Sequence, residues 1–448
     1  MLTPVKVYDK MNKEGQIEWV GTQVNQEAIE MFHAVRENNQ KEAVSLFKQS
    51  LETSRNNHGL EELSEFAEAL HQAGFLEEAK TAYLLLQNMS PELEEWNLFL
   101  AEIYIDQNEL ESALDTLLKF DESSELYPHA LLMLADAYQT MGLYEVSEHK
   151  LLEAMKLLPE EPVIQYALGK LYQASGENKK AIIIFKSLME ANTQDLWAES
   201  LHILLADCYN AIGNFEEAVD CLEAVSDEEH TSDSRFQLGF AYLQLKEFNR
   251  ASQIIEDLLD KDPHYMSAYL YLSHAYQEEN RLEKALATIN KGIEVNPYQA
   301  EYYLEAAKLF LKLKDDSKAK EQVNKAIELE PELTEAVLLK ADLLLGQEEY
   351  EEVIQFLTSP AILSLPEHDW QLAKAYNGLE EFEKSAEYYQ KAYQVLSDDL
   401  IFLEDYIIFL QEEGNIKKLQ QVLELALTID PKNELLFELK ERVWCEDL

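Results

Sequence analysis

The sequence predicts an all-α protein, a solenoid of about twelve helix-turn-helix repeats that ends in a C-terminal capping helix. Three observations predict this class. A spacing of 34 residues recurs along most of the chain, and segments 132–159, 236–263 and 270–297 align without a gap. Glycine and proline are rare, with 13 and 11 in 448 residues, as in almost wholly helical proteins. The hydrophobic content of 47% is enough for a continuous core, so the chain is not disordered.

The period is clearest in a small residue, which we call the marker, on the predicted first helix of each unit. Successive markers are 34 residues apart in most units and 32 to 37 apart in the others. They are Ala67, Ala101, Ala135, Gly169, Ala206, Gly239, Ser273, Ala307, Ala341, Ala373 and, less typically, Ile407. A second small residue follows twelve positions after nearly every marker. Because antiparallel helices approach closely where small side chains meet, this spacing predicts a packed helix pair in each unit.

Glycine and proline mark the ends of these helices. Gly74, Gly142, Gly176 and Gly213 fall between first and second helices, where a left-handed residue commonly ends a helix. A proline closes many second helices, at Pro91, Pro159, Pro263, Pro297, Pro331 and Pro431. Three junctions look irregular: an insertion at 192–196, a polar run at 226–234, and 358–370, which replaces a regular second helix after the bulky Val353. We expect loops or bends at these junctions.

Both ends of the chain depart from the repeat. Residues 1–23 alternate like two short strands around a polar turn, which predicts a small hairpin or an unstructured segment. The repeats occupy residues 24–433. Residues 434–448 are predicted to form the last helix, which covers the apolar face of the final repeat.

The formal net charge of −49 is the strongest compositional signal. Such a field repels phosphate backbones and anionic lipids, so we expect no nucleic-acid partner and no membrane insertion. It attracts basic proteins; the alternative is that the acidity only keeps a long repeat protein soluble. No stretch reaches transmembrane length, and no apolar signal core is present. With three cysteines lacking metal-ligand spacing, the composition favours a cytoplasmic protein.

Catalytic and cofactor signatures are missing from the sequence. It contains no phosphate-binding loop, no HExxH, no paired CxxC and no GxSxG. The ten histidines are scattered, and carboxylates are too numerous for one pair to stand out. We therefore predict a protein that is not an enzyme and that needs no cofactor or metal.

The 34-residue unit, its two small residues, the aromatic residues between them and the closing proline resemble the tetratricopeptide repeat family, in particular its bacterial, cytosolic, multi-repeat members. The resemblance covers about residues 25–433. It implies a right-handed superhelix whose first helices line a concave groove. The groove lacks the Lys/Asn/Arg set with which chaperone-binding members clamp a peptide carboxylate, so that function is disfavoured.

In proteins of this family, ligands contact the residues three before, one after and four after the marker. Carried over to this chain, the predicted partner-binding residues are Glu68, Leu98, Glu102, Ile105, Leu132, Asp136, Tyr166, Lys170, Ile203, Asp207, Phe236, Phe240 and His274. For Leu98, Leu132 and Ile203 the alternative is packing against the neighbouring repeat.

We therefore expect a non-catalytic interaction scaffold whose acidic groove binds a basic, partly apolar segment of a partner protein. The alternative is a regulatory repeat protein whose groove binds a short signalling peptide. The segment 1–23 carries equal numbers of acidic and basic residues and several apolar ones, and we expect it in or near the groove. The oligomeric state is not predicted.

Overall fold

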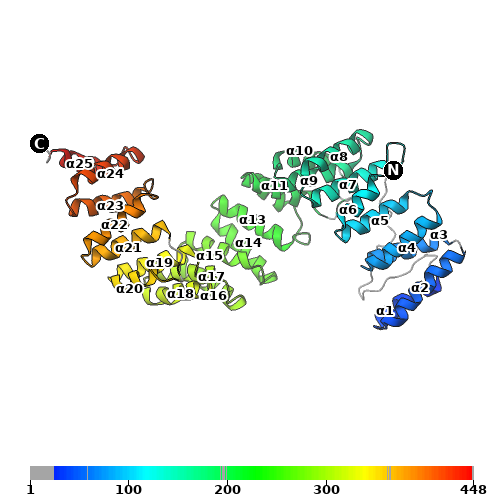
Figure 1. Ribbon diagram of the computed structural model, residues 1–448, viewed down its shortest axis with the longest axis horizontal. Coiled ribbons are helices and arrows are strands. Elements are labelled where there is room, and N and C mark those ends of the chain that lie inside the picture. The colour runs from blue at the N-terminus through cyan, green and yellow to red at the C-terminus, as the bar shows by residue number, and fades with distance from the viewer. Residues whose placement is uncertain are drawn as a thin grey trace. The chain divides into compact units, whose positions relative to one another are not determined.

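The structure is a computed structural model. It describes residues 25–57, 59–191, 193, 197, 199–360, 362 and 365–445. All the regular secondary structure within these residues is α-helical, in 25 helices (Figure 1). The predictions made for residues 1–23 lie outside the described part of the chain. The chain divides into two compact units, Met1–Asn214 (unit 1) and Phe215–Leu448 (unit 2).

Unit 1 holds the first eleven helices. They are α1 (Gln26–Arg36), α2 (Gln40–Asn57), α3 (Leu60–Gln72), α4 (Leu76–Met89), α5 (Glu95–Asp106), α6 (Leu110–Leu117), α7 (Tyr127–Thr140), α8 (Tyr144–Leu157), α9 (Pro162–Ala174), α10 (Asn178–Glu190) and α11 (Leu201–Ala211).

Unit 2 holds the remaining fourteen. They are α12 (Phe215–Glu223), α13 (Ser232–Gln244), α14 (Phe248–Lys261), α15 (Met266–Glu278), α16 (Leu282–Val295), α17 (Ala300–Lys312), α18 (Asp316–Leu329), α19 (Thr334–Gly346), α20 (Tyr350–Leu357), α21 (Pro366–Gly378), α22 (Phe382–Tyr393), α23 (Leu400–Glu412), α24 (Ile416–Ile429) and α25 (Glu434–Cys445).

The helix order gives twelve successive pairs and a single last helix, as predicted. Within unit 1 and within unit 2, the first helix of a repeat packs on the second helix of the same repeat. That second helix packs in turn on the first helix of the next repeat. First helices also contact one another, as α5 does with α7 and α13 does with α15. The first helices therefore form one layer of the stack. The last helix, α25, buries Leu436 and Val443 against α24, which confirms the predicted capping helix.

The markers lie where first and second helices approach most closely. Ala67, Ala101 and Ala307 are fully or almost fully buried, as are the small residues twelve positions later. A side chain on the glycine markers would collide with the partner helix. A Cβ added to Gly169 would lie 2.5 Å from a ring carbon of Phe185, and one added to Gly239 would lie 2.5 Å from Cγ1 of Ile255.

Every turn between a first and a second helix contains one residue with a positive φ. These residues are Asn38, Gly74, Asn108, Gly142, Gly176, Gly213, Lys246, Asn280, Lys314, Glu348, Glu380 and Gly414. Only five are glycines, so seven turns place a side chain in the left-handed region that L-residues adopt at some cost. Glycine therefore predicted fewer than half of these turns.

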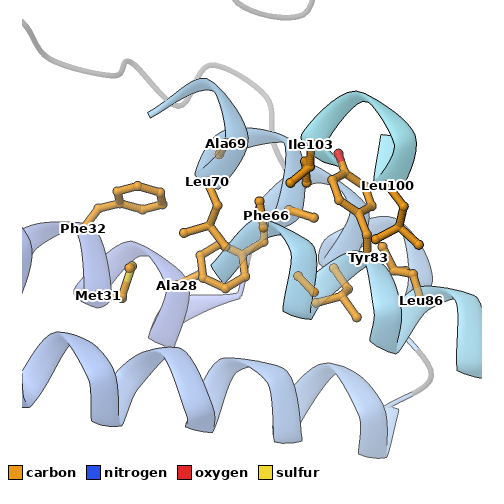
Figure 2. Packing of buried hydrophobic residues seen from close by; sticks show 14 of the residues in the cluster. Ala28, Met31, Phe32, Phe66, Ala69, Leu70, Tyr83, Leu86, Leu100 and Ile103 are labelled. Atoms are coloured by element: carbon orange, nitrogen blue, oxygen red, sulfur yellow. The ribbon is translucent and has the colours of Figure 1, made fainter. Parts of the chain in front are cut away.

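The core is distributed along the stack instead of forming one centre. Figure 2 shows its first part, where Phe32 of α1 meets Phe66 of α3 edge to face at a centroid distance of 6.1 Å. Tyr83 and Leu86 of α4 continue this cluster toward Leu100 of α5. Each pair thus completes its apolar face by contact with its neighbour, as expected for a repeat array.

A recurring contact holds cations beside the second helices. The aromatic residue three positions after the marker lies under a Lys or Arg eleven positions after the same marker. The pairs are Tyr172 with Lys180 (4.6 Å), Tyr242 with Arg250 (5.4 Å), Tyr276 with Lys284 (5.2 Å), Phe310 with Lys318 (5.3 Å) and Tyr376 with Lys384 (5.0 Å). We call these contacts cation–π staples. Each staple engages a Lys or Arg of the second helix with a ring of the first helix. These cations are therefore held between the two helices of a repeat and not on the opposite face of the first helix.

The irregular junctions agree only in part with expectation. The second helix α20 has 8 residues, against 14 in α18, so the repeat is shortened where the sequence indicated. The interruption is narrower than 358–370, because α21 begins at Pro366, a residue suited to a first helical turn. Part of the polar run 226–234 is helical too: Thr231 caps α13, which starts at Ser232. The short helix α6, with 8 residues, was not anticipated.

Candidate partner-binding face

The predicted partner-binding residues share one surface. Positions three before, one after and four after a marker follow the spacing of one helix face, and we call this surface the first-helix face. All thirteen predicted residues lie on first helices, and every one is partly or largely exposed. Ten belong to unit 1 and three, Phe236, Phe240 and His274, to unit 2.

In unit 1 this face is acidic. The first helices α3, α5 and α7 contain no lysine and no arginine. Between residues 61 and 160 the chain carries 22 carboxylates against four lysines. Glu68, Glu102 and Asp136 occupy the position after the marker on these three helices. With Asp106, whose carboxylate lies 2.7 Å from His71 Nε2, they form a set that we call the acidic row.

The acidic row holds its negative charge at an electrostatic cost. Displacement of solvent by neighbouring protein atoms raises the pKa of Glu68, and Glu65 and Glu102 raise it further. Loss of solvent also raises the pKa of Glu102, where Asp106 adds to the effect and His71 opposes it. The pKa of Asp136 is raised for the same first reason, with a contribution from Asp106. No Lys or Arg contributes to any of these shifts, so among the described residues the row has no permanent cation to offset it.

Two of the four lysines between residues 61 and 160, Lys80 and Lys150, are paired with other carboxylates. Lys80, on the second helix α4, pairs with Glu109 at 3.3 Å and lies over the ring of Tyr104. Lys150, on the second helix α8, pairs with Glu153 at 3.1 Å. Charge is therefore distributed unevenly between the two helices of these repeats. Lys80 and Lys150 lie on second helices, whereas the first helices α3, α5 and α7 carry carboxylates and no Lys or Arg.

Apolar residues accompany the acidic row. Leu98 of α5 and Leu132 of α7 are partly exposed, and both pack against the buried cluster that contains Ala101 and Leu134. Each of these two side chains is thus shared between the core and the surface, so binding and packing remain compatible roles for them. Ile105 and Ile203 are also partly exposed.

The first-helix face is less negative on α9 and α11, the two first helices at the C-terminal end of unit 1. Lys170 of α9 pairs with Glu199 at 2.9 Å, and Tyr166 stacks on Trp197 with a centroid distance of 4.2 Å. Asp207 of α11 accepts a hydrogen bond from Gln173 Nε2 at 2.8 Å. These predicted residues already have partners within the chain, so we place them at the edge of the candidate site.

At the start of unit 2, around α13 and α15, the face is aromatic. Phe236 and Phe240 of α13 both contact Tyr271 of α15, with centroid distances of 5.1 and 5.8 Å. Phe215 and Tyr265 extend the group, at 6.0 Å from Phe240 and 5.1 Å from Phe236. His274, the third predicted residue, is exposed and lies 3.8 Å from Glu278. We call the five rings the aromatic cluster.

Four contributors were not predicted from the sequence: Asp106, Tyr271, Phe215 and Tyr265, of which the first two lie close to the predicted positions. Asp106 stands five positions after its marker, and Tyr271 stands two before its own, so neither belongs to the three positions carried over from the family. A wider window on the same helix face would have included both, because these offsets lie one residue from the expected positions.

Two features, metal-ligand groups and membrane-spanning helices, are absent from the described residues. No group of three or more His, Cys, Asp or Glu side chains there could hold a metal ion. The same part of the chain contains no helix that is long and apolar enough to cross a membrane.

Comparison with known proteins decides the family. The chain is 34% identical over 374 residues to the TPR repeat-containing protein YpiA of Bacillus subtilis (strain 168), covering 83% of this chain and 88% of that protein. The chain belongs to the tetratricopeptide repeat family. Proteins of this family act as protein-interaction scaffolds and are generally not catalytic. Residues 139–193 match the family described as YpiA-like, tetratricopeptide repeats, and 366–433 match YpiA-like, C-terminal tetratricopeptide repeats.

Other tetratricopeptide repeat descriptions match further along the chain. They cover residues 199–227, 242–309 and 300–333. Among solved structures, a chain of the APC/C hetero-tetramer Cut9–Hcn1 is similar, with 11% sequence identity and a TM-score of 0.40. The similarity covers 94% of this chain and 96% of that chain. YrrB, described as a TPR protein with an unusual peptide-binding site, covers 42% of this chain and 95% of its own, with 18% identity and a TM-score of 0.36.

Proposed function

We propose that this tetratricopeptide repeat protein is a cytoplasmic scaffold that binds a basic, partly apolar segment of a partner protein on the first-helix face of unit 1. The observation that supports it best is the acidic row on three successive first helices that contain no lysine or arginine. Residues at the same position of successive repeats offer a partner evenly repeated carboxylates, which suits an extended or helical segment with repeated cations.

The raised pKa values support the same direction of binding. A carboxylate whose charge is disfavoured by lost solvent and by like charges gains most from an incoming cation. A Lys or Arg placed beside Glu102 or Asp136 would relieve repulsion that His71 offsets only in part at Glu102 and that no described group offsets at Asp136. Leu98 and Leu132 next to the row would contribute apolar contact, which mainly slows dissociation.

Differential capture from an extract of the source cell tests the proposal. The baits are the wild-type chain, a double variant Glu102→Lys/Asp136→Lys, and a control double variant Glu111→Lys/Glu145→Lys. Glu111 and Glu145 are exposed carboxylates ten positions after the same two markers, on second helices, so both variants change the net charge equally. We expect a partner with a basic segment to be retained by the wild type and the control and lost by the first variant. Equal retention by all three baits would contradict the proposed face.

A further inference from the structure

The aromatic cluster of unit 2 is unusual for its place in the repeat. The residue after the marker is charged or histidine in every repeat from the one marked by Ala67 to the one marked by Ala373, with one exception. The exception is Phe240. Phe236, Phe240 and Tyr271 are each partly exposed, and so are Phe215 and Tyr265 at the ends of the group. Five partly exposed rings in continuous contact form an apolar surface larger than isolated side chains provide.

The same two first helices show what their other aromatic residues do. Tyr242 of α13 lies under Arg250, and Tyr276 of α15 lies under Lys284 and Arg281. These rings face the second helices and already interact with a cation of the chain. Within the described residues, no cation–π contact reaches the rings of the aromatic cluster, although fourteen such contacts occur elsewhere. Its rings contact one another mainly edge to face and have no cation partner among the described residues.

Acidic groups border the cluster. The Tyr265 hydroxyl donates a hydrogen bond of 2.9 Å to Asp233, which stands one helical turn before Phe236. On the next first helix, α17, Lys308 pairs with Glu335 at 2.6 Å and Lys312 donates to the amide oxygen of Gln277 at 2.5 Å. The Asp233 carboxylate holds Tyr265 through its Oδ1 atom, and its pairing with a cation is not among the ion pairs of the described residues, whereas Lys308 and Lys312 are paired within the chain.

We propose that the aromatic cluster binds an arginine side chain of the partner protein. A guanidinium stacks flat on an aromatic ring and at the same time presents donors to a carboxylate, a combination that an ammonium group lacks. In this arrangement the guanidinium plane lies on the ring of Phe240 or Phe236, and its N–H groups donate hydrogen bonds to the Asp233 carboxylate. The inference rests on the proposed function, because it takes the partner segment to be basic, but it concerns a different unit and different residues.

Binding of three labelled synthetic peptides to the full chain tests this assignment. Each repeats the unit Ala-Arg-Ala-Leu, with arginine, lysine or the neutral isostere citrulline at the basic position, and fluorescence anisotropy reports the dissociation constant. We expect the arginine peptide to bind at least about tenfold more tightly than the citrulline peptide to the wild type, because one well-formed cation–π contact contributes up to about tenfold and the acidic row adds its attraction for the charged peptide. Lysine should fall between them. A lysine peptide that binds as well as the arginine peptide would overturn the assignment to a guanidinium.

Variants separate the cluster from the acidic row. Phe240→Leu keeps apolar volume but removes the ring face, so it should reduce the preference for arginine over citrulline several-fold. Phe437→Ala, at an exposed phenylalanine of α25 outside the cluster, should leave the preference unchanged. An unchanged preference in Phe240→Leu would overturn the proposal. Glu102→Lys/Asp136→Lys should weaken binding without altering the effect of Phe240→Leu; if it has no effect on binding, the acidic row fails while the cluster stands.

Discussion

Replacing Gly169 by alanine tests whether close helix approach defines the repeat. The new Cβ would lie 2.5 Å from Cε1 of Phe185 and 3.0 Å from its Cδ1 and Cζ atoms, well inside the separation of about 3.5–4.0 Å at which carbon atoms attract. Phe185 is fully buried, so its ring has little room to move. Overpacking of this kind costs up to about 3 kcal/mol, while the gain in helix propensity is about 1 kcal/mol. The net expectation is a loss of about 2 kcal/mol.

The matched control is Gly346→Ala. Gly346 is the last residue of α19, it has no positive φ, and an added Cβ would meet nothing within 4 Å. The same substitution should therefore stabilise, by up to about 1 kcal/mol. Urea unfolding combined with hydrogen exchange of α9 and α10 measures both, because an array of repeats does not have to unfold in one step. Stabilisation by both variants would refute the packing argument. Restoration of stability by adding Phe185→Leu to Gly169→Ala would support it.

Three further predictions follow from local geometry. Lys314→Gly should stabilise by about 1 kcal/mol in urea unfolding, because Lys314 has a φ of 61°, whereas Gly142→Ala should destabilise; opposite signs would contradict the left-handed assignment. Glu102→Gln should raise the melting temperature at neutral pH and leave it nearly unchanged near pH 4. The pKa of Glu102 is higher in the folded than in the unfolded chain, so its contribution to the free energy of unfolding is fully favourable below the unfolded-state pKa. That contribution is lost as the pH rises through the folded-state pKa. A difference in melting temperature that does not depend on pH would argue against this. Tyr276→Phe should cost about 1 kcal/mol in thermal unfolding by removing the hydroxyl that donates to Glu256, and no loss would exclude a stabilising role for that hydrogen bond.

The repeat architecture was predictable because it depends on spacing. A small residue every 34 positions requires helix pairs of similar length, and the order of α1 to α25 confirms them. Turn residues such as Lys314 and Glu348 were not predictable, because neither residue type signals a positive φ. The shortened α20 was foreseen from the break after Leu357, but its limit at Pro366 depends on where the next helix packs.

The candidate site was predictable to the level of one helix face. Glu68, Glu102 and Asp136 follow from the family register, and the structure adds Asp106 through its contact with His71. The aromatic cluster required three-dimensional information, since Tyr271 and Phe240 come from different repeats. The positions of the cations are visible in the sequence, but their contacts with the rings were not predicted, because each staple joins two residues eight positions apart on two different helices.

The association rate of the captured partner tests most directly the central claim that the first-helix face of unit 1 recruits a basic segment. Stopped-flow measurements would compare the wild type, Glu102→Lys/Asp136→Lys and Glu111→Lys/Glu145→Lys at low and at high salt. Since both variants carry the same net charge, only the placement of charge differs between them. We predict that the first variant associates about tenfold more slowly at low salt, with a difference that shrinks as salt shortens the Debye length to about 3 Å at 1 M, and that the control stays close to the wild type. Equal rates for the two variants would contradict the claim.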